Sequence, residues 1–250
     1  MEEVIEIIPV QGIPLIHPGS DIVGLIVESI RQSKLDIRDG DIFVIAHTVV
    51  SKAEGRIQKA SDITVSSKAR KIAEKNDFDP IQVEIALNES QRVLRDDRAL
   101  ITETRNGHIC NFSGVDHSNA PPESYLLLPL DADRSADSIR KGIEQIVQRN
   151  VAVVISDTEG RPWRKGAINI AIGCSGINAY RHNQGKPDLY GRILQRSLVC
   201  QIDQIASAAE LIMGQADEGI PVVIVRGFIY EKGEETAKDI HRSKEENLFL

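Results

Sequence analysis

The sequence contains 250 residues, 41% hydrophobic and 27% charged, which is ordinary for a soluble globular protein and enough for one large domain or two small ones. Its formal net charge of -7 argues against nucleic-acid binding, which depends on clustered Lys and Arg. No apolar run approaches the ~20 residues that span a bilayer, and the acidic N-terminus Met1-Glu2-Glu3 lacks the basic flank of a signal peptide, so we expect a cytoplasmic protein with no membrane partner.

In the first half of the chain, apolar periodicity predicts strands and helices separated by polar turns. Pro14 excludes a helix after the first strand, and Ser20 and Asp21 are suited to begin the first helix. The polar stretch after the second strand contains Lys52, and we expect an exposed loop there. The expected elements are a strand at 4–10, a loop at 11–16, a helix at 20–33, a strand at 41–46, a loop at 47–56, and helices at 66–75 and 80–95.

The second half begins with a predicted hairpin around Asn106-Gly107, a dipeptide typical of tight turns between antiparallel strands. Gly214 is suited to end a long helix, and the charged tail from Glu231 shows little pattern. The three cysteines are too far apart for a zinc ribbon or a redox pair, so we expect them to be buried apolar residues. The expected elements are strands at 98–103, 108–112 and 125–130, a helix at 135–148, strands at 151–156 and 167–172, a loop at 183–191, a helix at 192–213 and a strand at 221–225.

The stretch 151–166 joins a core strand to a polar cluster. A β-branched run is followed by Asp157, Thr158 and Glu159, at the point where we expect the strand to end. Acidic oxygens at a strand terminus suit a hard divalent metal, and the cations that follow, beginning with Arg161, suit phosphate or carboxylate groups. An ordinary polar loop, with Asp157 capping a turn, is the alternative interpretation.

A second polar cluster follows the hairpin strand that ends near Phe112. Gly114 precedes Asp116, and this aspartate and Asn119 could face one ligand, although an Asx-rich turn explains them almost as well. His117 has no second histidine at ligand spacing, which favours a loop residue over a zinc ligand.

Taken together, the polar clusters resemble the coenzyme F420 γ-glutamyl ligase family over the whole length of the chain. Each motif is weak alone, but their common order and comparable spacing make the resemblance strong. The stretches that match, in order, are 12–16, 51–56, 114–119, 157–161, 188–192 and 213–227.

This resemblance implies a GTP-dependent amide ligase that adds L-glutamate to the deazaflavin precursor F420-0, and to F420-1, through an acyl-phosphate intermediate. It also implies two divalent metals, Mg²⁺ or Mn²⁺, assistance by K⁺, and a homodimer. The implied fold is α+β, with mixed and antiparallel sheets and flanking helices. A single ligase unit would then contain two intertwined subdomains, approximately 1–80 with 200–250, and 81–199.

The resemblance also implies roles for individual residues. The first metal would lie between Asp116 and Asp157, and the second near Thr158 and Gln215, while Lys52 and Arg161 would act with the two aspartates in catalysis. His47 stands where the family has a small hydroxyl residue, and Gln215 offers a neutral amide oxygen. The residues implied to bind GTP are Ile13, Pro14, Leu15, Ile16, His47, Thr48, Lys52, Asn119, Met213, Gly214, Gln215, Ala216, Asp217, Glu218, Gly219 and Ile220.

Three other functions remain open at this point. A metal-dependent phosphohydrolase is one, because Asp157 to Gly160 faintly resembles a phosphatase nucleophile loop, although the second aspartate and the threonine after the glycine are missing. A non-catalytic nucleotide-binding module is another, and a ligase of the same fold with a different carboxylate acceptor is the third.

Overall fold

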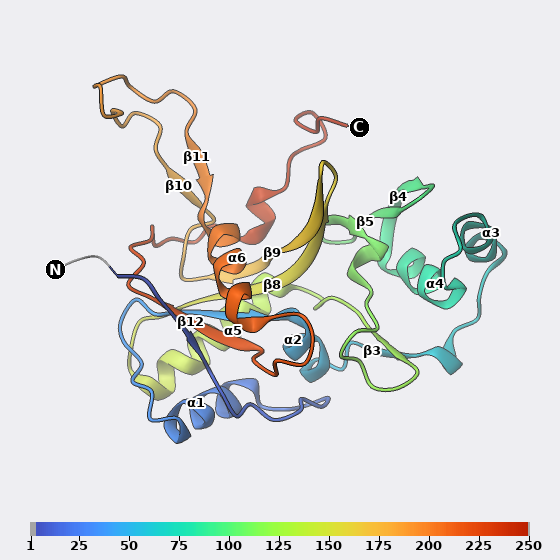
Figure 1. The fold of residues 1–250 in the computed structure, drawn as a ribbon, viewed down its shortest axis with the longest axis horizontal. Coiled ribbons are helices and arrows are strands. Elements are labelled where there is room, and N and C mark those ends of the chain that lie inside the picture. Colours follow the sequence, from blue (N-terminus) through green and yellow to red (C-terminus); the bar gives the residue numbers. More distant parts are fainter. Residues whose placement is uncertain (1–3, 250) are drawn as a thin grey trace.

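The computed structural model of the chain describes residues 4–249 and shows four sheets with flanking helices (Figure 1). The expected α+β class, with mixed and antiparallel sheets, is confirmed. The elements are β1 Glu6–Pro9, α1 Ile22–Gln32, β2 Ile42–Ala46, α2 His47–Ala53, β3 Ile57–Lys59, the 3-10 helix η1 Ala60–Asp62, α3 Ser67–Asn76, α4 Pro80–Glu89, β4 Ser90–Asp96, β5 Leu100–Thr104, β6 Ile109–Asn111, η2 Phe112–Gly114, β7 Ser124–Leu126, α5 Ala132–Val147, β8 Ala152–Arg161, β9 Arg164–Ser175, β10 Tyr180–His182, β11 Leu198–Cys200, α6 Gln201–Met213, β12 Val222–Arg226 and η3 Ala237–Ile240.

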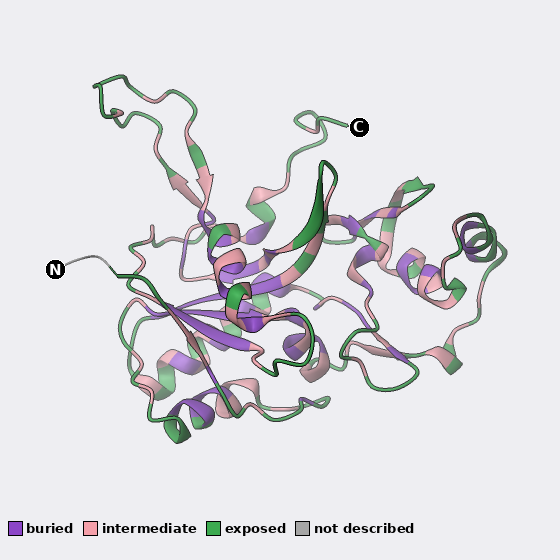
Figure 2. Ribbon diagram, viewed as in Figure 1, coloured by how far each residue is buried: buried purple, intermediate pink, exposed green. Residues whose placement is uncertain are grey.

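The largest sheet has the strand order β1-β12-β2-β8-β9. The central pair, β2 and β8, runs parallel, and the other neighbouring strands run antiparallel. Phe43 and Val153 face the helices α1 and α5, whereas Val44 and Val154 face α6, so a hydrophobic cluster covers each side. β2 and the first half of β8, Ala152–Ile155, are therefore apolar, as expected for strands buried on both faces, and Figure 2 shows them buried between the exposed outer surfaces.

A smaller sheet, β4-β5-β6, packs with α3 and α4 at one side of the molecule (right in Figure 1). Its hydrophobic cluster includes Ile72, Val83 and Leu100. The expected Asn-Gly hairpin is confirmed, since β5 pairs with β6 and Gly107 has a φ of 83°. β3 and β7 form a separate antiparallel pair, and β3 lies to the right of α2 in Figure 1.

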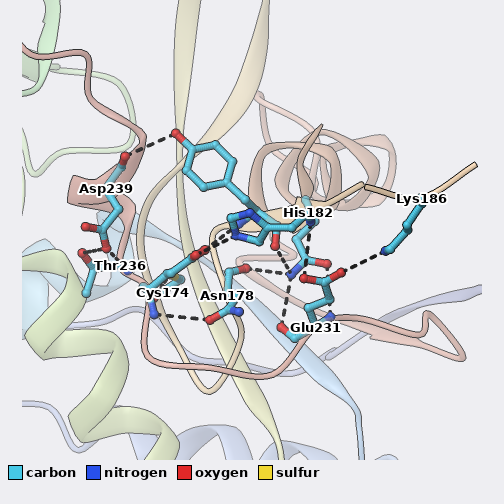
Figure 3. Close-up of polar contacts among 10 residues, drawn as sticks. Cys174, Asn178, His182, Lys186, Glu231, Thr236 and Asp239 are labelled. Atoms are coloured by element: carbon cyan, nitrogen blue, oxygen red, sulfur yellow. Dashed lines mark hydrogen bonds and ion pairs between the residues drawn. The ribbon is translucent and has the colours of Figure 1, made fainter. Parts of the chain in front are cut away.

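Residues 180–200 form a projecting arm, built from the antiparallel pair β10 and β11 and the extended loop between them (upper left in Figure 1). The side chains of Leu189 and Tyr190 in this loop are fully exposed. At the base of the arm, His182 Nε2 lies 2.9 Å from Glu235 Oε1, and other polar contacts join the arm to the C-terminal segment (Figure 3). The tail from Glu231 is therefore ordered, although its sequence shows little pattern.

Two expectations in the first half of the chain are wrong. The polar stretch after β2 is the short helix α2 rather than an exposed loop, and it packs Val49 and Val50 into the core. The helix expected through residue 95 ends at Glu89, and β4 follows. Residues of mixed propensity there form a strand because β5 offers an antiparallel partner.

Two expectations in the second half are also wrong. Strand β8 continues through Arg161 instead of ending near Ser156, because β9 pairs with it along the whole polar stretch. The long helix begins at Gln201 rather than 192, since Leu198–Cys200 pair with β10 and the residues before them belong to the arm. Its end at Gly214 is confirmed.

Several further expectations concern the chain as a whole. Cys110 and Cys174 are buried as expected, and Cys200 is half-buried. Among the described residues, no helix is both long and apolar enough to cross a bilayer. The expectation about Met1-Glu2-Glu3 falls outside residues 4–249. The largest sheet takes β8 and β9 from the expected 81–199 subdomain and its other strands from the 1–80 and 200–250 subdomain, and that division stays a prediction.

Candidate active site

A cavity of about 520 Å³ opens where the parallel pairing of β2 with β8 ends. Ala46 pairs with Ser156 in this ladder, so the residues that follow, His47 and Asp157, are brought side by side. The turn after α6 closes the cavity from another direction, because Ala46 N donates to Pro221 O at 2.9 Å. A volume of this size is within the ~300–1,000 Å³ common for ligand pockets.

The structure brings together almost all the residues that the sequence singled out. Every predicted metal or GTP residue lines this cavity except Asp217, and of the predicted catalytic residues Lys52, Asp116 and Asp157 line it. Arg161 does not. Their roles stay predictions, but their convergence from five separate parts of the chain is a property of the fold.

On the sheet side of the cavity, Asp157 and His47 form a buried pair. Nε2 of His47 lies 3.1 Å from Oδ1 of Asp157, and Nδ1 lies 3.3 Å from Oγ of Ser51. Burial alone would lower the pKa of His47, but the carboxylates of Asp157 and Asp116 raise it above its usual value. Burial would raise the pKa of Asp157, yet His47 and the backbone N–H of Thr158 hold it below its usual range. The pair therefore favours an imidazolium facing a carboxylate.

Asp116 lies on the loop side of the cavity, in the turn between η2 and β7. Its Oδ1 accepts hydrogen bonds from the backbone N–H groups of His117 and Ser118, at 2.7 and 2.9 Å, and from Oγ of Ser118 at 2.9 Å. This is the Asx-type turn of the alternative interpretation, and it also fixes the carboxylate at the cavity wall. Within residues 4–249, Asp116 forms no ion pair, so its charge has no cationic partner among the described side chains.

A chain of hydrogen bonds orients the other predicted metal residues. Oγ1 of Thr158 donates to Oδ1 of Asn169 at 2.8 Å, and the backbone N–H of Asn169 donates to Oε2 of Glu210 at 2.8 Å. Oε1 of Glu210 accepts from Nε2 of Gln215. With its nitrogen engaged in this way, Gln215 keeps its amide oxygen for other partners.

These side chains fit a hard divalent cation. Residues 4–249 contain no cluster of three or more His, Cys, Asp or Glu arranged as a complete metal site. The cavity offers instead the carboxylates of Asp116 and Asp157, besides that of Glu218 in the turn 213–221, together with hydroxyl and amide oxygens. Oγ of Ser156 is buried there without a hydrogen-bond partner in the described part of the chain. Mg²⁺ suits such a set, because it takes few protein ligands and completes its shell with phosphate and water.

Lys52 and Arg161 are placed differently. Lys52, in the last turn of α2, lines the cavity, and partial burial lowers the pKa of its ammonium. Arg161 instead closes the β8–β9 turn, donating from Nε to Gly166 O and from one terminal nitrogen to Lys165 O, each at 3.1 Å. Arg161 thus stabilises the β8–β9 hairpin, and Lys52 is the lysine or arginine that lines the cavity within the described chain.

The turn 213–221 owes its shape to a glycine. Gly214 ends α6 with its N–H donating to Glu210 O at 3.0 Å, and it has a φ of 63°. A Cβ at this position would lie 2.1 Å from Cδ of Glu218, whose carboxylate accepts from the N–H of Ala216 at 2.8 Å. The positive φ therefore favours glycine here, and any other residue would also displace the carboxylate of Glu218.

The polar cavity residues that the sequence interpretation did not assign to the site include Gln82, Ser156 and Asn169. Gln82, on α4, donates from Nε2 to Val115 O at 2.8 Å and so supports the turn that carries Asp116. Ser156 ends an apolar run, which could have marked it. Asn169 carries no comparable signal, since only its register opposite Thr158 in the β8–β9 hairpin brings it to the site.

The sequence matches known proteins along nearly its whole length. Residues 12–227 match the family model described as F420-0:Gamma-glutamyl ligase. A protein of Methanothermobacter thermautotrophicus named coenzyme F420:L-glutamate ligase is 41% identical over 248 residues, covering 98% of each chain. Proteins with the same name are 43% identical in Methanopyrus kandleri, over 96% of each chain, and 45% identical in Methanocaldococcus jannaschii, over 85% of this chain and 86% of that one.

Proposed function

The chain belongs to the F420-0:γ-glutamyl ligase family, and from this we propose that it joins L-glutamate to the deazaflavin F420-0, and to F420-1, at the expense of GTP. The observation that carries the proposal is the cavity where the β2–β8 pairing ends, in which segments far apart in the chain place Asp116, Asp157 and Lys52 around one space. That space is large enough for a nucleotide rather than for a small ion alone.

In the proposed reaction, an oxygen of the acceptor's carboxylate attacks the γ-phosphorus of GTP, and GDP leaves. The amine of L-glutamate then attacks the carbonyl carbon of the acyl phosphate, phosphate leaves, and the amine proton is lost to give the γ-linked amide. The protein's task in such a transfer is positioning and neutralisation of charge.

The side chains of the cavity suit this task. Lys52 would hold phosphate oxygens as a compact positive charge. Asp116 and Asp157 would hold Mg²⁺ or Mn²⁺, with Thr158 and Gln215 near a second ion, and such ions neutralise charge on the transferred phosphoryl group. The imidazolium of His47, held at 3.1 Å by Asp157, keeps one carboxylate oxygen oriented and leaves the other for a cation.

The turn 213–221 would complete the nucleotide site. The N–H of Ala216 is already committed to Glu218, at 2.8 Å, so the turn keeps its shape without a ligand. Ile13 and Leu15 supply apolar surface on the opposite wall, suited to the flat face of a base. A K⁺ ion is proposed from the resemblance alone.

A homodimer is part of the proposal, and the arm supports it. Leu189 is 102% and Tyr190 96% exposed at the tip of residues 180–200, an arrangement that leaves apolar surface in contact with water. A second copy of the chain would cover that surface. Light scattering tests this, because Leu189→Ser with Tyr190→Ser should shift the protein toward the monomer.

The decisive experiment is mass spectrometry of the deazaflavin product after incubation with GTP, Mg²⁺ and L-glutamate. The proposal requires products extended by glutamyl units, with one GDP formed per bond. GTP consumed in the absence of acceptor would indicate a phosphohydrolase instead, and GTP bound but never consumed would indicate a nucleotide-binding module. GTP consumption that depends on glutamate and a different carboxylic acid would keep the reaction and replace the acceptor.

A further inference from the structure

The molecule has a second cavity, of about 240 Å³, that meets the candidate active site at η2. Ser113 lines this second cavity, whereas its neighbours Phe112 and Gly114 line the first. These three residues have φ values of 54°, 49° and 69°, so the backbone between the cavities is held in an unusual left-handed conformation. Among the described residues, none lines both cavities.

The second cavity carries an excess of positive charge. Arg56, Arg105 and Lys238 line it, against Glu89 as its carboxylate within the described chain. Arg56 is paired with that carboxylate, and its Nε donates to Leu128 O at 3.0 Å. Arg105 is exposed and donates from one terminal nitrogen to Asn88 O at 3.1 Å, which leaves the rest of its guanidinium free for an anion.

Lys238 contributes a further positive charge to the second cavity, from a distant part of the chain. It lies on η3, and its Nζ forms an ion pair at 2.8 Å with Oδ2 of Asp131, which lies outside the cavity lining, so Arg105 is the lining cation without a carboxylate partner among the described residues. Arg105 belongs to the β5–β6 turn, so the two cations reach the cavity from different elements. Cations supplied from separate elements suit an anion with charge at two positions, and the small volume excludes a nucleotide.

Two imidazoles line the same cavity. The rings of His108 and His241 stack with their centroids 5.6 Å apart. Nε2 of His108 is buried and has no hydrogen-bond partner among the described residues. Burial, and next the neighbouring His241, lower the pKa of His108 to about 4, so its ring is neutral near pH 7. A buried polar atom without a partner is destabilising, and a ligand that hydrogen-bonds to it in the cavity would remove that cost.

We propose that this second cavity binds a small dicarboxylate anion, with Arg105 and Lys238 holding its carboxylates and His108 donating or accepting a hydrogen bond. The guanidinium of Arg105 matches a carboxylate in shape as well as charge. Such an anion has two sources, free L-glutamate or another dicarboxylic acid of similar length. The inference does not rest on the proposed function, because it concerns residues outside the candidate active site.

Calorimetric titration of the full chain with L-glutamate and with glutarate, without nucleotide, tests the proposal. Histidine ring signals in NMR spectra report where the ligand binds, and we expect the signals of His108 and His241 to move. Arg105→Gln should weaken binding roughly tenfold, the usual effect of losing one charge-assisted hydrogen bond. Lys238→Gln should weaken it as well. Arg98→Gln, which alters an exposed arginine in the turn between β4 and β5, is the matched control and should change affinity less than about twofold.

The outcomes separate the sources of the anion. If L-glutamate binds and Arg105→Gln raises its KM in ligation with kcat unchanged, the cavity is a subsite for the substrate. If glutarate binds as tightly as L-glutamate and Arg105→Gln leaves the KM for L-glutamate unchanged, the ligand of the cavity is a dicarboxylate other than the substrate. The proposal is wrong if neither acid moves the two histidine signals, if Arg105→Gln and Arg98→Gln behave alike, or if inorganic phosphate binds as tightly. An inactive ligase that still binds the acid here would overturn only the proposed function.

Discussion

The candidate active site has a sheet side and a loop side, and each holds its carboxylate by different means. On the sheet side, the half-buried Asp157 is matched by the buried His47, 3.1 Å away. On the loop side, Asp116 is held by backbone N–H groups and Ser118. The charge of Asp157 is thus balanced by His47 within the protein, whereas the charge of Asp116 has no cationic partner among the described residues and is available to a bound ligand or metal. This comparison predicts that Asp157 contributes more to the stability of the fold than Asp116 does.

The largest expected effect is the loss of ligation in Asp116→Ala and in Asp157→Ala. Each change should lower turnover by ~10²–10³-fold, because each removes a group that stabilises charge in the transition state. The melting temperature separates the two sides: Asp116→Ala should melt like the wild type, and Asp157→Ala should melt lower. Turnover close to wild type in either variant would remove that residue from the site.

Lys52→Gln should raise the KM for GTP by roughly 10- to 100-fold, because a charged hydrogen bond to phosphate is lost. Lys68→Gln, which alters an exposed lysine on α3, is the control and should leave the KM unchanged. A KM for GTP that is the same in both variants would place the phosphates elsewhere.

The pH dependence of stability tests the His47–Asp157 pair. The pKa of Asp157 is lowered in the folded protein, so its contribution is present above the ordinary aspartate pKa of 3.8 and is lost as the pH falls. The pKa of His47 is raised, so its contribution is present below 6.5 and is lost as the pH rises through the folded value. Asp157→Asn should therefore cost about 1–3 kcal/mol near pH 5.5 and less near pH 9, as urea unfolding would show. An equal cost at both values would contradict the charged pair.

Glu159, two residues after Asp157 on β8, provides a further test of the electrostatics on the sheet side. Burial, with Asp157 and Asp203 nearby, raises the pKa of this carboxyl to about 7. The folded protein therefore binds a proton more tightly than the unfolded chain, and stability falls as the pH rises from 4.5 to about 7. Glu159→Gln should raise the melting temperature at pH 8 by a few degrees and leave it unchanged at pH 4, measured by calorimetry. A variant that melts lower at pH 8 would show that the charge is needed.

Arg161→Gln should have the smallest effect, less than about threefold on turnover, because its guanidinium binds the carbonyls of its own turn. Steady-state kinetics at saturating GTP would show this. A loss as large as that of Lys52→Gln would mean that the hairpin moves Arg161 toward the phosphates during the reaction.

Apolar periodicity and cap residues were enough to predict much of the fold. The buried strands β2 and β12 were predicted correctly because runs of β-branched residues strongly favour strands. The start of α1 was predicted from Asp21, which is the N-cap of this helix and whose carboxylate accepts from Gly24 N. Elements whose state depends on a distant partner were not found. Ser90–Asp96 is a strand because β5 lies beside it, and Thr158 stays in β8 because Asn169 pairs with it.

The candidate site could be predicted as a set of residues but not as an arrangement. Polar clusters after apolar strands pointed to Asp157 and Asp116. The sequence could not show that His47 would neutralise one of them, since the contact depends on the register of Ala46 with Ser156. In the sequence, Arg161 is one of several cations that follow Asp157, and nothing distinguishes it from the others. In the structure, β8 extends as far as Arg161 and places this residue at the β8–β9 turn, outside the cavity lining.

The order of the largest sheet also bears on how the protein is made. β1 pairs with β12 alone, and β12 lies between β1 and β2. During translation, β1 and the edge of β2 that pairs with β12 stay unpaired until residue 226 has left the ribosome. Exposed strand edges attract other chains, so the nascent protein should depend on chaperones or rapid late folding more than its modest size suggests.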